Sequence, residues 1–78
     1  MPKYFFHIRG PIGFTEDEDG IELPDIEAAR NEATKAARDI VRDAVLSHQK
    51  VSDNTIEIVG EAGAILLVYP VKDVIQRI

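Results

Sequence analysis

The chain has 78 residues, 45% of them hydrophobic, no cysteine, and a formal net charge of −5 at pH 7. This length predicts one small globular domain, which buries only about 60–65% of its unfolded surface and often gains stability from a partner. The lack of cysteine excludes disulfides and thiolate metal sites and fits a reducing compartment, so we expect a soluble cytoplasmic protein. The opening residues do not resemble a signal peptide, and the longest apolar run, residues 64–69, is too short to span a membrane. The acidic charge disfavours nucleic acid and anionic membranes as partners.

Residues 3–9 predict a β-strand, because aromatic and β-branched side chains dominate them. The alternation of a strand divides these side chains between two faces, with Tyr4, Phe6 and Ile8 on one and Phe5, His7 and Arg9 on the other. Glycine and proline in residues 10–13 break the strand. A short second strand then begins at Phe14 and resumes after the acidic turn of residues 16–20, so this region predicts an irregular hairpin.

Asp25 predicts the N-cap of a long helix that continues to about Ser47 without glycine or proline. At helical spacing, eight residues share one apolar arc, and five of them are alanines: Ile26, Ala29, Ala33, Ala36, Ala37, Ile40, Val41 and Ala44. Small side chains let this helix lie close to a sheet. His48 follows the helix, where a protonated imidazole complements the negative end of the helix dipole.

The last third of the chain predicts a second hairpin and a short helix. Residues 55–59 alternate like a half-buried strand, residues 60–63 form a glycine-bounded loop, and residues 64–69 are apolar on both faces. In this last strand, Ile65, Leu67 and Tyr69 share one face, and Leu66 and Val68 share the other. A closing helix after Pro70 is indicated by apolar residues at helical spacing: Val71, Val74, Ile75 and Ile78. The whole chain predicts a two-layer α+β fold of ββαββ type, with an antiparallel sheet, a long amphipathic helix on one face and a short C-terminal helix.

Several short segments carry a family resemblance: the opening Met1-Pro2-x-Tyr4-Phe5-Phe6-His7, the acidic turn ending in Gly20, the helix start Leu23-Pro24-Asp25, and Glu61-Ala62-Gly63 before an apolar strand ending at Pro70. In these features the chain resembles a family of short bacterial proteins known only as a domain of unknown function. The resemblance covers nearly the whole chain and implies a compact ββαββ unit, without an activity or site residues. A weaker likeness is to the N-terminal domain of small antitoxins of the toxin–antitoxin type, which also pass through an acidic Asp-Gly turn and a Pro-Asp pair into a helix. Here Asp25 enters the helix directly, without room for the third strand usual in those domains.

The candidate chemical motifs each have a simpler structural interpretation. The acidic turn, aligned as a calcium loop, would place Ile26 where a bidentate glutamate is needed, so we expect a solvated turn and no metal. The pair Gly60 and Gly63 joins two strands beside Glu61, which indicates a hairpin and not a nucleic-acid clamp. For His7 the sequence nominates no nucleophile or carboxylate within reach. We therefore expect a hydrogen-bonded or partly exposed sheet histidine, no cofactor and no enzyme activity.

The polar side of the helix carries a basic flank, which consists of Arg30, Lys35, Arg38 and Arg42. Three pairs at i,i+3 spacing predict an exposed surface of ion pairs: Glu27–Arg30, Glu32–Lys35 and Asp39–Arg42. The same flank is the best candidate for an anionic partner.

The leading functional hypothesis is a non-enzymatic protein-interaction domain that self-associates, most simply as a homodimer. Both faces of the predicted sheet carry apolar side chains, and the long helix covers one face only. In the monomeric alternative, the closing helix covers the second face. Two further hypotheses are an antitoxin-like or nucleic-acid-associated regulatory module that uses the basic flank, and a ligand or enzyme site around Tyr4, His7 and Tyr69. The candidate partner surface comprises Phe5, His7, Arg30, Arg38, Arg42 and Tyr69.

Overall fold

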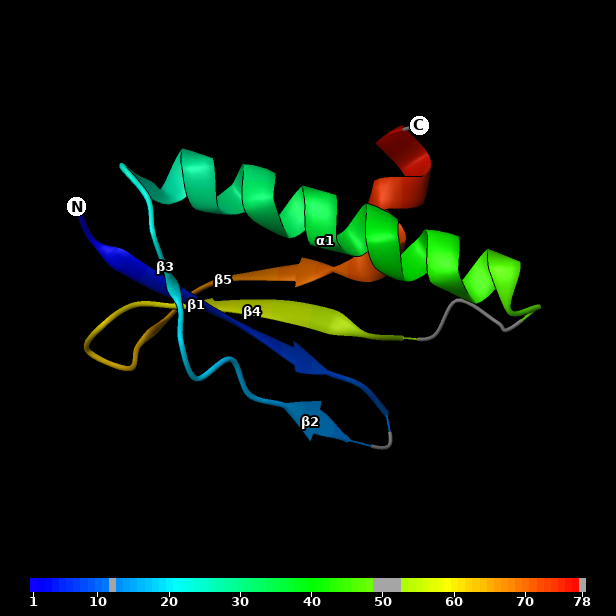
Figure 1. The fold of residues 1–78 in the computed structure, drawn as a ribbon, viewed down its shortest axis with the longest axis horizontal. Helices are drawn as coiled ribbons and strands as arrows, with labels where there is room; N and C mark the ends of the chain where they lie inside the picture. The colour runs from blue at the N-terminus through cyan, green and yellow to red at the C-terminus, as the bar shows by residue number, and fades with distance from the viewer. Residues whose placement is uncertain (12, 49–52, 78) are drawn as a thin grey trace.

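One long helix lies across one face of a five-stranded antiparallel sheet in the computed structural model, which describes residues 1–11, 13–48 and 53–77 (Figure 1). In chain order the elements are β1 (Lys3–Arg9), β2 (Phe14–Thr15), β3 (Ile21–Glu22), helix α1 (Ile26–Leu46), β4 (Thr55–Val59), β5 (Ile65–Pro70) and the 3₁₀ helix η1 (Val71–Arg77). This arrangement confirms the predicted two-layer α+β class. Residues 49–52 of the predicted connection and Ile78 of the predicted closing helix lie outside the described residues.

The sheet has the strand order β2-β1-β4-β5, and β3 also pairs with β1. One edge of β1 pairs with β4 from Phe5 to Arg9. The other edge pairs with β2 near Arg9 and with β3 near Lys3. The irregular second strand of the predicted hairpin is therefore two short strands. The expectation that no third strand precedes the helix was wrong, because β3 forms one that is two residues long.

Helix α1 begins and ends where the sequence predicts. The side chain of Asp25 accepts a hydrogen bond of 2.9 Å from the backbone N–H of Ala28, which satisfies a donor that the first turn leaves free. At the other end, the Ser47 N–H donates to the Asp43 carbonyl. His48 then adopts a positive φ of 56° and its N–H donates to the Val45 carbonyl, so its backbone conformation closes the helix.

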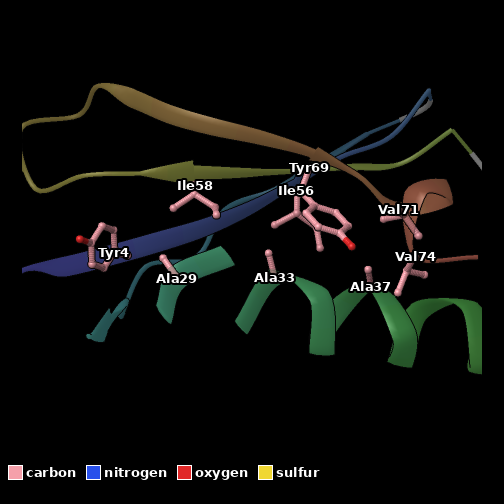
Figure 2. Packing of buried hydrophobic residues seen from close by; sticks show 9 residues of the cluster. All are labelled: Tyr4, Ala29, Ala33, Ala37, Ile56, Ile58, Tyr69, Val71 and Val74. Atoms are coloured by element: carbon pink, nitrogen blue, oxygen red, sulfur yellow. The ribbon is translucent and has the colours of Figure 1, made fainter. Parts of the chain in front are cut away.

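The core lies between α1 and the sheet (Figure 2). Three alanines of the predicted apolar arc, Ala29, Ala33 and Ala37, are completely buried and face larger side chains of the strands. Those side chains include Tyr4, Ile56, Ile58 and Tyr69. The arc does not extend to the start of the helix, because Ile26 in the first turn is exposed.

Helix η1 packs on the same side of the sheet as α1 (Figure 1). Val71 and Val74 are fully buried in the cluster that contains Ala37 (Figure 2). The Val71 N–H donates to the Asn54 carbonyl at 2.9 Å, which holds the start of η1 beside the entry to β4. The expectation, in the monomeric alternative, that the closing helix covers the second face of the sheet was therefore wrong, because η1 completes the helix-side core.

A β-bulge changes the side-chain alternation in β5. Ile58 pairs with Leu67, but the next residue of β4, Val59, pairs with Ile65, so Leu66 is an extra residue. Paired residues share a face, and Val59 also pairs with Phe5 on the face opposite α1. The prediction that Ile65 shares a face with Leu67 and Tyr69 was wrong, because the bulge turns Ile65 to the other face. We call that face, opposite α1, the open face.

Candidate interaction surface

The open face consists of three cross-strand rows that run from β5 through β4 to β1. The rows are Ile65–Val59–Phe5, Val68–Glu57–His7 and Pro70–Thr55–Arg9. The first row is apolar throughout, and the polar side chains gather on β4 and β1 in the other two. The face is therefore apolar along β5 and polar along β1.

The polar half of the open face is held together by Glu57. This carboxylate is 8% exposed and accepts a bond of 2.7 Å from Nε of Arg9. The Arg9 guanidinium also lies 4.5 Å from the centre of the Phe14 ring, a cation–π distance. The His7 ring meets the same Phe14 ring edge-on at 5.5 Å. A buried carboxylate is costly without a partner, and Arg9 provides that partner here.

Asp17 fills the stretch of the β1 edge that lies between β2 and β3. Its Oδ2 accepts the backbone N–H of Phe6 at 3.1 Å. Its Oδ1 accepts the N–H groups of Asp19 and Gly20, at 3.2 and 3.1 Å. The carboxylate thus bonds both the strand edge and the acidic turn. Sequence reasoning treated this turn only as a solvated charge run, although the Asp17-x-x-Gly20 spacing is a signal for an aspartate that bonds its own turn.

The electrostatics around Asp17 follow from these bonds. Burial raises the pKa of Asp17, but the N–H groups of Phe6, Gly20 and Asp19 and the neighbouring His7 lower it by more, so the pKa lies below its ordinary value of 3.8. The Asp17 N–H in turn donates to Nδ1 of His7 at 3.0 Å. Because Nδ1 accepts this bond, the proton of neutral His7 is on Nε2. The expectation of a hydrogen-bonded or partly exposed sheet histidine is confirmed, since His7 is both bonded and half-buried.

A shallow hollow of about 340 Å³ lies between the acidic turn and the β4–β5 loop. Phe5 and Val59 are among its apolar lining residues, and Glu16, Glu18 and Glu61 contribute carboxylates. Gly20 approaches so closely that a Cβ on it would lie 2.9 Å from the Phe5 ring, and only a glycine tolerates both that approach and its φ of +70°. The charge of the hollow repels anions. In the described part of the chain, no three His, Cys, Asp or Glu side chains are placed to hold a metal ion.

Two apolar side chains of β5 stand exposed on the open face, where they pair with Val59 and Glu57 of β4. Ile65 and Val68 are 56% and 50% exposed. We call these two residues the β5 patch. The sequence contains no charged residue between Glu61 and Lys72, so the patch is neutral as well as apolar. Exposed apolar groups that adjoin one another are typical of interaction sites.

The predicted partner surface does not form one continuous site. Phe5 and His7 lie half-buried on the open face. The three arginines of the set belong to α1 on the other side of the sheet, where Arg38 and Arg42 are exposed and Arg30 is half-buried. Tyr69 does not belong to an accessible surface, because it is 5% exposed in the core and its hydroxyl accepts a bond of 3.4 Å from Thr34. Tyr4 is buried in the same core, so His7 shares no site with these two tyrosines.

The basic flank of α1 is largely paired within the helix. Lys35 Nζ lies 3.3 Å from Glu32, and the Arg42 guanidinium lies 3.0 Å from Asp39. These two predicted pairs are confirmed. The third is not, because the described residues include no ion pair between Glu27 and Arg30. The sequence pattern did not reveal the β5 patch, because strict alternation placed Ile65 and Val68 on opposite faces.

Comparison with known families places this chain in a wider group. A family model described as a domain of unknown function, DUF6894, matches residues 3–72. The chain belongs to this family. No curated protein and no solved structure matches the DUF6894 chain. Within its described residues, no helix has both the length and the apolar character needed to cross a membrane.

Proposed function

We propose that this DUF6894 chain is a non-enzymatic interaction domain that self-associates as a dimer through the open face of its sheet. The observation that carries the proposal is the β5 patch, whose two apolar side chains are at least half exposed on the open face. Neither α1 nor η1 packs on this face (Figure 1). Removing apolar surface from water is favourable by about 25 cal/mol per Å², so contact over this face stabilises whatever covers it.

The non-enzymatic part of the proposal is supported by the partners of the open-face polar groups. The Glu57 carboxylate is bonded to Arg9, and the Asp17 carboxylate accepts three backbone N–H groups. Nδ1 of His7 already accepts a backbone N–H. A general base needs an acceptor free to take a proton from a substrate. These groups instead fix the positions of β1, β2 and the acidic turn.

A second copy of the chain suits the patch better than an anionic partner does. The chain carries a net charge of −5, and the hollow beside the patch is lined with carboxylates. Nucleic acid and anionic lipid are repelled from such a face. The basic flank of α1 is a weak alternative site for these anionic partners, because its Lys35 and Arg42 side chains are already paired with carboxylates. Two neutral β5 patches meet without bringing like charges together at the centre of the contact.

Light scattering after gel filtration, at tens of micromolar protein, tests the proposal. We expect a mass near twice the 8.7 kDa of one chain, falling toward the single-chain value on dilution. A mass of one chain over the whole concentration range would contradict self-association.

A further inference from the structure

We infer that the second copy packs on the face of β5 and not along its edge, with Ile65 and Val68 at the centre of the contact. This inference rests on the proposed self-association and specifies its interface. Strand β5 is at the end of the sheet order, so in principle it offers two modes of contact. Another strand can extend the sheet along its edge, or a second sheet can pack against its open face.

The backbone of β5 is poorly suited to edge pairing. The Val71 N–H donates to the Asn54 carbonyl, next to the entry to β4. In an antiparallel ladder, the backbone N–H groups that face one neighbouring strand recur at every second residue. Leu67 and Tyr69 therefore direct their backbone groups to β4, and Val68 and Pro70 direct theirs to the free edge. Pro70 has no N–H. On the other side of Val68, the bulge at Leu66 interrupts the regular spacing of the backbone N–H groups that point to the free edge.

Only the Val68 N–H is thus left as a regularly spaced donor on the free edge of β5. A pairing strand needs donors repeated along its length, so proline and bulge together protect this edge. The same bulge turns Ile65 to the open face, where it joins Val68, and Ile65 is more than half exposed. One irregularity thus weakens the edge and adds an exposed apolar side chain to the end of the face.

The occupant we assign to this face is a second copy, on grounds of charge and symmetry. The patch lies at one side of the open face, on the edge strand, and the acidic turn lies over β1 at the other side. A two-fold axis along β5 brings the two neutral patches together. The same rotation places Glu16 and Glu18 of the two copies on opposite sides of the contact, where their repulsion is screened by solvent and salt.

A matched pair of substitutions tests the interface. Val68→Lys places a charge in the patch, and Val45→Lys makes the same change on α1, where Val45 is 63% exposed. Ile65→Lys provides a second patch variant in case Val68→Lys fails to fold, as judged by its circular dichroism. We expect the folded patch variants to have the mass of one chain and Val45→Lys to have the mass of the wild type.

Amide hydrogen exchange of the wild type then separates the face from the edge. Packing on the face leaves the Val68 N–H without a carbonyl acceptor, so its exchange should slow by less than about tenfold between dilute and concentrated protein. A monomeric wild type would contradict the proposed function itself. A dimer that survives the patch substitutions, or one in which Val68 exchange slows a hundredfold or more, would overturn only the face-packed interface.

Discussion

At the scale of single residues, Asp17 takes the place of a strand. Between β2 and β3 the edge of β1 has no strand partner, and the carboxylate of Asp17 accepts the Phe6 N–H there. A carboxylate that accepts several N–H groups is bound more strongly than a neutral acceptor. The sequence marks Asp17 as a turn residue, but its bond to a strand 11 positions away depends on the folded hairpin. Local pattern alone therefore could not assign this role.

We expect Asp17→Asn to destabilise the domain by about 1–3 kcal/mol at pH 7, because an amide cannot replace both acceptor oxygens and a charged hydrogen bond is lost. The matched control is Asp19→Asn in the same turn, an exposed position whose substitution should change stability by less than about 0.5 kcal/mol. Urea unfolding of the three proteins measures the difference.

The difference in unfolding free energy between the wild type and Asp17→Asn should depend on pH in a defined direction. The folded-state pKa of Asp17 is lowered below 3.8, so its carboxylate contributes stability in full above that value and loses it as the pH falls through the folded pKa. The gap between wild type and Asp17→Asn should therefore shrink below about pH 4. A gap that stays constant down to pH 2 would show that the charge of Asp17 is not its source.

At the scale of elements, α1 was well predicted and β5 was not. The helix carries its own signals: an N-cap at Asp25 and an alanine arc that recurs with helical spacing. Strand β5 is apolar at every position from Ile65 to Val68, so its sequence contains no alternation that could reveal a bulge. The side on which η1 packs was likewise unpredictable, because Val71 and Val74 fit either face of the sheet.

The orientation of α1 can be tested by two adjacent substitutions. Ala37→Arg should destabilise the domain by several kcal/mol, since it forces an unpaired charge and a long side chain into a fully buried contact. Arg38→Ala, one position along on the exposed side, should change stability by less than about 0.5 kcal/mol. Thermal melts that are equal for the two variants would mean that another side of α1 faces the sheet.

At the scale of the whole molecule, the two faces of the sheet differ in how they are completed. On one face, α1 and η1 cover a core whose largest fully buried side chains are Ile56, Ile58, Val71 and Val74. On the other, ion pairs and hydrogen bonds organise the part over β1, and the part over β5 stays apolar and exposed. The α+β class and the surplus of apolar side chains followed from the sequence. The precise patch did not, because it depends on the bulge and on the placement of η1.

Isotope-filtered NOE spectroscopy tests the central claim most directly. Labelled and unlabelled chains are mixed, so that only contacts between copies give signals. We predict intermolecular NOEs at the methyl groups of Ile65 and Val68 on the open face. Intermolecular NOEs confined to Val45 and Leu46, which are exposed on α1, or no intermolecular NOEs at a concentration of several hundred micromolar, would contradict the account.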